Sequence, residues 1–473
     1  MPQPRRQVRP IEPVVGDGLA AIRAELDVPT SFPADVLDAA AGPGPEITGE
    51  REDRRDLAMV TIDPAGSTDL DQALAIEATP EGGHVVWYAI ADVAAFVVPG
   101  GPVDRESRRR GVTLYSPDGR APLHPPALSE GAASLLADQD RPAVLWRLVL
   151  DGEGQLGEVS VGRATVRSRA QLSYVQAQAR IDGGDPVLGP LAVVGQQRIA
   201  IERERGGISL PVPEQDVVRD GDCYRLTYRA QLPVEQWNAQ LSLLCGMAAA
   251  DLVLAGGWGL LRTLPPADEE ALAELRRHAT ALGVVWPDGV AYAEVIHGID
   301  PDDPAHAAFL IQATRLFRGA DHVVVRPGST TPRDELVHAA IAAPYAHVTA
   351  PLRRLGDRFA TECVLATVGG QEPPAWVQES LDELPDLLRS AMSRASALDR
   401  AVVDHLEALV LSSHVGERFP AVVVDRRRDG SVVQLREPAV VATVPGELDL
   451  GAEVEVGVVA ADPVARIVEL AVR

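Results

Sequence analysis

The chain has 473 residues, of which 46% are hydrophobic and 24% charged, as in a folded protein long enough for more than one domain. Its three cysteines are far apart and form no CxxC pair, which excludes a thiolate zinc site and argues against a disulfide framework. The formal net charge of −24 counts against a broadly nucleic-acid-binding surface, so binding of nucleic acid would require a local basic groove in an acidic body.

Residues 1–55 are expected to form an accessory segment. Residues 18–26 and 34–41 have apolar side chains at helical spacing, and a Gly/Pro-rich break and a charged linker follow them. The first residues lead into no apolar signal region, so we expect a cytoplasmic protein.

Three carboxylates are concentrated in residues 59–73, where an apolar run passes through a Pro/Gly/Ser turn that carries Asp63, Asp69 and Asp71. Because like charges repel, such a segment is best explained by a cation between them, and Mg²⁺ prefers oxygen ligands. The alternative is a solvated turn, since Asp, Ser, Gly and Pro are ordinary turn residues. The spacing does not fit a calcium loop of the EF-hand type. From spacing alone, a metal site and a plain turn remain about equally supported.

Residues 61–64 and 68–73 resemble the signature of the ribonuclease II family, whose catalytic RNB domain hydrolyses single-stranded RNA from its 3′ end. The resemblance implies that Asp63 and Asp71 hold Mg²⁺ and that Asp69 binds a second ion or its waters. The family pattern ends in two adjacent Asp residues, and Gln72 stands at the second. We expect Gln72 to act as a neutral ligand, so that Gln72→Asp would raise activity at limiting Mg²⁺. The implied catalytic residues of this loop are Asp63, Asp69 and Asp71, and the implied metal ligands are Asp63, Asp69, Asp71 and Gln72.

A hairpin is predicted over residues 73–77 and 84–91, and a charged helix over residues 104–110. The arginines of that helix are typical of a solvated face. The next segment resembles the Tyr-x-Pro segment of the family, in which the tyrosine packs against the terminal nucleotides. The resemblance implies that Tyr115 stacks on RNA bases, with ordinary half-buried packing as the alternative.

A second hairpin is predicted over residues 143–150 and 157–167, and the helix start after it resembles the family's Leu-Ser-Tyr. The resemblance implies that Tyr174 clamps RNA at the far end of the channel. Asp251 interrupts the apolar residues 241–261, so we expect a buried core helix there rather than a membrane span. The helices predicted in this part of the chain cover residues 191–206, 238–254 and 268–282.

The second informative stretch, residues 344–357, has a proline at a predicted helix start followed by two arginines. Guanidinium groups beside a helix N-terminus suit phosphate, because their planar fork binds two oxygens. The stretch resembles the family's Thr-Ser-Pro-Leu/Ile-Arg-(Arg/Lys)-Tyr-x-Asp. This implies that Arg353 contacts the scissile phosphate or its neighbour as a catalytic residue, and that Arg353 and Arg354 bind RNA. For Arg354, an ion pair with Asp357 is the alternative.

From residue 414 the sequence changes to five short β-branched runs separated by Gly, Asp and Pro turns, which predict a small OB-type barrel. The predicted fold class is therefore α+β. It combines a mixed-sheet RNB catalytic domain with surrounding helices, residues 56–412, and a C-terminal all-β OB-like barrel, residues 413–473. Residues 1–55 are too short and too poor in β-branched and aromatic residues to form the OB-type cold-shock domains that bacterial members of the family often carry.

These features predict a hydrolytic 3′-to-5′ exoribonuclease that degrades single-stranded RNA to nucleoside 5′-monophosphates with Mg²⁺, or alternatively Mn²⁺. We expect a monomer with no membrane segment. The sequence has no glycine-rich phosphate loop, so no nucleotide cofactor is expected either. The alternative, which Gln72 keeps open, is a catalytically inactive protein of the same fold that binds RNA or a protein partner.

Overall fold

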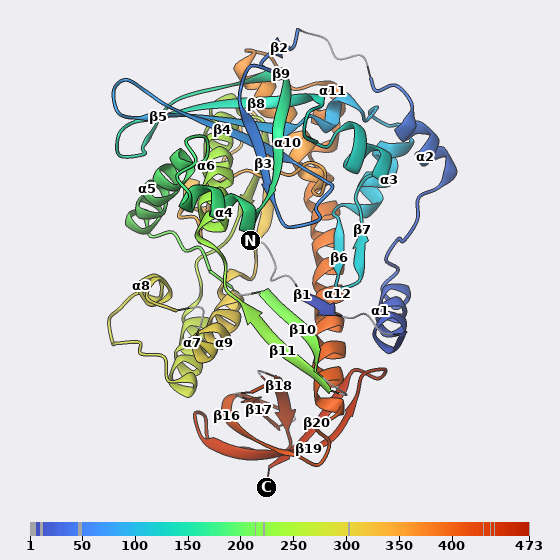
Figure 1. The fold of residues 1–473 in the computed structure, drawn as a ribbon, viewed down its shortest axis with the longest axis vertical. Coiled ribbons are helices and arrows are strands. Elements are labelled where there is room, and N and C mark those ends of the chain that lie inside the picture. Colours follow the sequence, from blue (N-terminus) through green and yellow to red (C-terminus); the bar gives the residue numbers. More distant parts are fainter. Residues whose placement is uncertain are drawn as a thin grey trace.

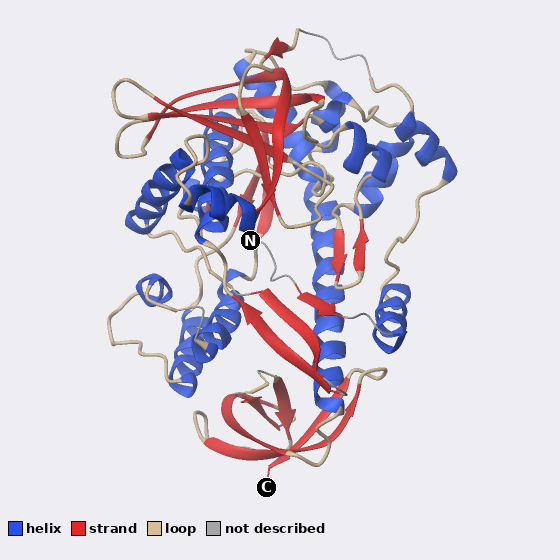
Figure 2. Cartoon of the chain, viewed as in Figure 1, coloured by secondary structure: helices blue, strands red, loops and turns tan. Residues whose placement is uncertain are grey.

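The computed structural model describes residues 6–9, 13–45, 50–212, 214–220, 223–300, 303–428, 430–435, 437–438 and 440–472. A large body of sheet and helices lies at one end and a small barrel at the other (Figures 1 and 2). The long helix α12 (Leu384–Ser412) runs between them and contacts strands of the barrel. The predicted α+β class is confirmed, with a six-stranded mixed sheet as the main sheet of the body and a five-stranded antiparallel sheet in the barrel.

The main sheet has the strand order β2-β9-β3-β4-β5-β8. Strand β9 is long enough to pair with β3 through its last residues and with β8 through most of its length, so the pairings of β3, β4, β5, β8 and β9 form a closed ring. Only the pairings of β9 with β2 and β3 are parallel. The bounds are β2 (Glu52–Asp53), β3 (Met59–Asp63), β4 (Gln72–Ala78), β5 (His84–Ala91), β8 (Asp140–Leu150) and β9 (Leu156–Ser173).

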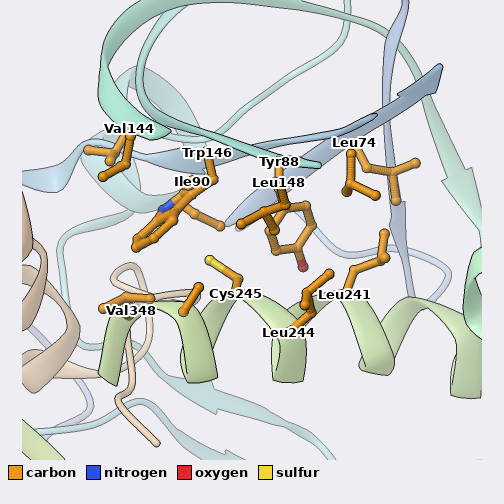
Figure 3. Packing of buried hydrophobic residues seen from close by; sticks show 14 of the residues in the cluster. Leu74, Tyr88, Ile90, Val144, Trp146, Leu148, Leu241, Leu244, Cys245 and Val348 are labelled. Carbon is orange, nitrogen blue, oxygen red and sulfur yellow. The ribbon is translucent and has the colours of Figure 1, made fainter. Parts of the chain in front are cut away.

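Both faces of this sheet are covered, which explains why its strands are apolar on both sides. One face packs on α4 (Tyr174–Asp182), α5 (Gly189–Arg205), α6 (Pro233–Gly256) and α10 (Leu355–Val368) in the largest core cluster. Figure 3 shows Leu74, Tyr88 and Leu148 of the sheet facing Leu241 and Cys245 of α6. The other face packs on α2 (Ala34–Ala41), α3 (Pro102–Arg110) and Leu352.

The apolar helix α6 (Pro233–Gly256) is the one described helix that is long and apolar enough to cross a membrane. Half of its most apolar window is buried inside the protein, and its residues belong to the largest core cluster. The expected core helix is confirmed in this position.

The charged helix α3 (Pro102–Arg110) differs from the predicted solvated face. Asp104, Glu106 and Arg110 are all buried. Arg358 of α10 forms an ion pair with Asp104, and Arg110 Nε donates to Glu106 Oε1 at 2.7 Å. The predicted solvated face holds for Arg105 and Arg109, which are exposed, and is wrong for the buried side of the helix. Burial there depends on contacts from distant segments, such as Arg358, which a charge run alone does not reveal.

The remaining elements of the body surround the sheet or lie between it and the barrel. Strand β1 (Arg6–Arg9) pairs in parallel with β10 (Glu214–Asp220), which pairs with β11 (Cys223–Arg229). The other strands are β6 (Leu114–Ser116), β7 (Gly119–Ala121), β12 (Gly259–Thr263), β13 (Asp321–Val325), β14 (Val337–His338) and β15 (Ala343–Pro344). The other helices are α1 (Pro13–Glu25), α7 (Glu269–Leu282), α8 (Tyr292–His297), α9 (Pro304–Ala313), α11 (Ala375–Ser380) and the short turns η1 (Val93–Ala95), η2 (Leu128–Ala132), η3 (Thr314–Phe317) and η4 (Arg333–Leu336).

The C-terminal barrel has the antiparallel order β18-β17-β16-β19-β20, and its edge strands β18 and β20 contact each other. Each of the five predicted β-branched runs forms one of its strands. Their alternating valines fill the interior, as expected of a small OB-like barrel. The bounds are β16 (Arg418–Arg427), β17 (Gly430–Leu435), β18 (Val441–Val444), β19 (Glu453–Asp462) and β20 (Ile467–Val472).

Candidate active site

The acidic loop, residues 64–71, connects the end of β3 to the start of β4. Gly66 has a φ of 81°, a left-handed conformation that glycine adopts at little cost. Leu70 is buried and anchors the loop, because its N–H donates to Ser134 Oγ at 2.9 Å. The hydroxyl of Ser134 in turn donates to the carbonyl of Thr68 at 2.7 Å. The backbone that carries the acids is therefore fixed by the protein itself.

Asp71 joins the two sequence motifs. It is 5% exposed, and its Oδ1 accepts a hydrogen bond from the N–H of Leu352 at 2.8 Å. Its Oδ2 lies 3.7 Å from Nε of Arg353. Burial raises the pKa of Asp71 well above its usual range, and the Arg353 guanidinium acts in the opposite direction. The acidic loop and the arginine motif, 281 residues apart at this bond, thus meet in one site.

Arg353 is accessible and at the same time surrounded by acidic groups and tyrosines. Its side chain is 44% exposed. Although burial acts to lower it, the pKa of Arg353 is raised by electrostatic interaction with Tyr115, Asp71 and Asp357. Tyr174 adds to the same effect. A guanidinium with this exposure is available to a phosphate group.

Arg354 forms the ion pair with Asp357 that the spacing allowed. Nε of Arg354 lies 3.0 Å from Oδ1 of Asp357, and Nη2 lies 2.7 Å from Oδ2. Asp357 is buried and also accepts the N–H of Ala350 at 2.7 Å. The pair therefore ties the start of α10 to the loop before it, while contact between Arg354 and RNA stays a prediction.

The hairpin of β6 and β7 presents Tyr115, which pairs across the hairpin with Arg120. Tyr115 is 48% exposed, yet burial raises the pKa of its hydroxyl, while Arg353 acts to lower it. Tyr115 and Arg353 are therefore within electrostatic range of each other, and the ring of Tyr115 is accessible. Such a ring offers a stacking face to a base, so the predicted role of Tyr115 fits its position.

Tyr174 is the first residue of α4 and follows directly on β9. Ser173 is the register partner of Asp63 and caps α4 through its side chain. Tyr174 is also within electrostatic range of Arg353. The parallel pairing of β3 with β9, which the sequence did not reveal, places Tyr174 beside the acidic loop. Its role as an RNA clamp at the far end of a channel stays a prediction.

Asp69 forms an ion pair with Arg120, a residue that the sequence analysis missed. The two side chains are 12% and 23% exposed. Arg120 Nη2 also contacts Glu130 Oε1 at 2.8 Å and the hydroxyl of Thr68. Arg120 thus already supplies positive charge to the acidic loop. A single arginine in a short hairpin carries no sequence signal for this contact.

Gln72 is not arranged as the expected metal ligand. Its Oε1 accepts hydrogen bonds from the hydroxyl of Tyr88 at 2.5 Å and from Ser242 Oγ at 3.2 Å. Its Nε2 donates to the carbonyl of Thr349 at 2.6 Å. Because these two hydroxyl groups lie against the amide oxygen, a cation would have to displace one of them to bind it.

The carboxylates fit Mg²⁺ in part. Mg²⁺ usually binds through one or two carboxylates together with substrate phosphates, rather than in a cage made only of protein. Asp63 is the last residue of β3, and it lies within electrostatic range of Tyr88, whose hydroxyl donates to Gln72. Among the residues that the structure describes, no group of three or more His, Cys, Asp or Glu side chains is arranged to hold a metal ion. A two-carboxylate site fits the donor set, and a four-residue site that includes Gln72 does not.

Comparison with protein families gives two matches. Residues 51–368 match the model of the RNB domain, and residues 417–473 match the C-terminal S1 domain of RNase II-type exonucleases. Ribonuclease R of Aquifex aeolicus is 28% identical over 448 residues, which are 87% of this chain and 61% of the relative. The exosome complex exonuclease RRP44 homolog A of Arabidopsis thaliana is 31% identical over 407 residues, 81% of this chain and 42% of the relative. The chain thus spans about half the length of these curated relatives.

Solved structures share the fold. The apo form of Mycoplasma genitalium RNase R matches with a TM-score of 0.82 and 21% identity, covering 96% of this chain and 77% of that one. Yeast Ssd1, described as a pseudonuclease, matches with a TM-score of 0.70 and 15% identity, covering 92% of this chain and 56% of that one. At these identities the likeness concerns the fold, and it extends to proteins with and without nuclease activity.

Proposed function

The chain belongs to the RNB-domain family, and from this membership we propose that it is a hydrolytic 3′-to-5′ exoribonuclease of single-stranded RNA. The products would be nucleoside 5′-monophosphates. The observation that carries the proposal is the meeting of Asp71 with Arg353, since it joins buried negative charge to an accessible guanidinium at one point. Mycoplasma genitalium RNase R, which shares the fold, has been solved in complex with single-stranded RNA.

Each residue of the site has a separate role in the proposed reaction. Arg353 neutralises charge that develops on the phosphoryl oxygens, and Tyr115 stacks on a base near the 3′ end. Mg²⁺ or Mn²⁺, held by Asp63 and Asp71, would supply the Lewis acid that activates water and stabilises the leaving oxygen. Recognition of 2′-hydroxyl groups in a narrow site would exclude DNA.

The test is incubation of the purified protein with 5′-labelled single-stranded RNA in Mg²⁺, in Mn²⁺ and in EDTA, beside an Asp71→Asn variant. We expect a metal-dependent ladder that shortens from the 3′ end and is absent from the variant. An RNA that stays intact in every metal, with a wild-type protein that folds normally, contradicts the proposal.

A second candidate is a catalytically inactive protein that binds RNA or a protein partner. Two observations favour it. The amide of Gln72 forms hydrogen bonds within the protein, and the fold is shared with a pseudonuclease. RNA that is retarded on a gel but never cleaved would support RNA binding without hydrolysis. If RNA is neither cut nor bound, a protein partner is the remaining candidate.

A further inference from the structure

Gln72 and Asp71 are neighbours in sequence but lie on opposite faces of the main sheet. Successive residues of a strand point to opposite faces. Leu74, two residues after Gln72, packs in the core cluster formed with α6. Ala73, two residues after Asp71, packs in the cluster on the other face, which contains Leu352. Gln72 therefore points toward α6, whereas Asp71 faces the cluster that contains Leu352.

The amide of Gln72 connects three segments at this place. Tyr88 comes from β5 and Ser242 from α6, and their hydroxyl oxygens lie 2.8 Å apart beside the amide oxygen. Figure 3 shows the Tyr88 hydroxyl pointing from the sheet toward α6. The third partner is the carbonyl of Thr349, which can only accept a hydrogen bond. The amide orientation is thereby determined, since a flipped amide would place its oxygen against this carbonyl.

Thr349 begins the turn that carries Arg353. The side chain of Thr349 accepts a hydrogen bond from Arg354 Nη2 at 3.3 Å. The next residue, Ala350, accepts the N–H groups of Arg353 and Arg354 at 3.2 and 3.0 Å. Thr349 and Ala350 are both buried, so a movement at Thr349 is transmitted to Arg353 through a closed turn.

We propose that Gln72 is a positioning residue: through the Thr349 carbonyl, it fixes the turn that places Arg353 beside Asp71. This inference rests on the proposed function for its consequence, which is phosphate contact by Arg353. The role requires an amide. A carboxylate at residue 72 has no N–H to donate, and its oxygen would face the carbonyl oxygen of Thr349. The position that departs from the family pattern is thus adapted to a different task in this chain.

Hydrogen exchange tests the structural part without RNA. Gln72→Leu and Gln72→Glu both remove the donor to Thr349, and both should speed exchange in a peptide that covers residues 345–356. Tyr88→Phe keeps that donor and should leave exchange there close to wild type. Gln434→Leu, which removes a buried amide in the barrel, is the control for loss of a buried glutamine. Gln72→Glu keeps the size of the side chain and replaces Gln72→Leu if that variant does not fold.

RNA binding tests the consequence. A fluorescein-labelled single-stranded oligoadenylate is titrated in EDTA, so that no cleavage interferes. Gln72→Leu should weaken binding by about tenfold or more, the usual effect of losing a hydrogen bond to a charged group. It should also reduce the salt dependence of binding by about one phosphate contact. In an Arg353→Ala background, Gln72→Leu should have little further effect on affinity, because the residue through which it acts is gone.

The outcomes separate this inference from the proposed function. If the wild-type protein neither binds nor cleaves RNA, the proposed function fails, and exchange at residues 345–356 still decides whether Gln72 holds the turn. Unchanged exchange in a folded Gln72→Leu protein overturns the inference. An equal loss of RNA affinity with and without Arg353 overturns it too. So does a Gln72→Asp variant that is more active at limiting Mg²⁺, since that result would make residue 72 a metal ligand.

Discussion

His124 should make the stability of the RNB domain sensitive to mild acid. His124 is 2% exposed, and its Nε2 lies 3.3 Å from the carbonyl of Pro351, next to the turn that carries Arg353. Burial, reinforced by the positive charge of Arg358, lowers the pKa of His124 to about 3 from an ordinary value of 6.5. The folded protein therefore keeps this imidazole neutral, whereas the unfolded chain protonates it below pH 6.5.

The sign and size of the effect follow from these two values. The stabilising contribution is fully present above pH 6.5 and is lost as the pH falls from 6.5 toward 3, because only the unfolded chain gains a proton in that window. Between pH 7.5 and pH 5, the loss from this one residue is about 2 kcal/mol. His124→Gln can still donate to the carbonyl of Pro351 but cannot titrate.

Urea unfolding at pH 7.5 and pH 5 measures the difference. Tryptophan fluorescence is the signal, since five of the six tryptophans lie within residues 51–368, and the sixth, Trp376, packs against Phe359 of α10. The wild-type protein should lose about 2 kcal/mol more than His124→Gln over this pH range. Other buried histidines titrate in both proteins and cancel in the comparison. An equal loss in the two proteins would refute the reasoning.

Three further predictions concern the site. Arg120→Met leaves Asp69 without its ion-pair partner, so binding of Mn²⁺, measured by electron paramagnetic resonance, should become tighter, and an unchanged Kd would count against a shielding role. Arg353→Lys keeps the charge but loses the planar fork, so kcat on single-stranded RNA should fall by about 100-fold or more, while near-normal turnover would remove Arg353 from the chemistry. Tyr115→Ala should weaken RNA binding by about 1–3 kcal/mol in fluorescence anisotropy, and Tyr115→Phe should bind normally; equal losses would point to the hydroxyl rather than the ring.

Much of the secondary structure was predictable because it depends on patterns within short stretches of the sequence. Apolar runs joined by turn residues indicated the strands around residues 84–91 and 143–167, and five β-branched runs indicated the barrel. Helix α7 ends at residue 282, as predicted, and Gly283 after it adopts the left-handed conformation. What periodicity could not provide was the pairing of distant strands. The parallel pairing of β3 with β9, for example, places Tyr174 beside the acidic loop, and no local pattern indicated this.

The residue types of the site were predictable, and their partners were not. Asp71 and Arg353 were selected because carboxylate and guanidinium groups suit phosphate chemistry, and the structure brings the two together. No sequence pattern marked Arg120, since the role of an isolated arginine depends on which acid it contacts in the folded protein. The burial of Asp104 on α3 was not predicted for the same reason, because its partner Arg358 lies more than 250 residues away in the sequence.

Gln72 shows how a departure from a family pattern should be interpreted. Considered alone, the change from a carboxylate to an amide removes a charge from a metal site and suggests weaker metal binding or lost activity. The strand that carries Gln72 changes this interpretation, because alternation directs Asp71 and Gln72 to opposite faces of the sheet. On its own face, the amide meets two hydroxyl groups and a carbonyl, and only a group that both accepts and donates can serve all three. The substitution therefore changes which segment residue 72 holds in place, and it leaves Asp63 and Asp71 to provide the negative charge of the site.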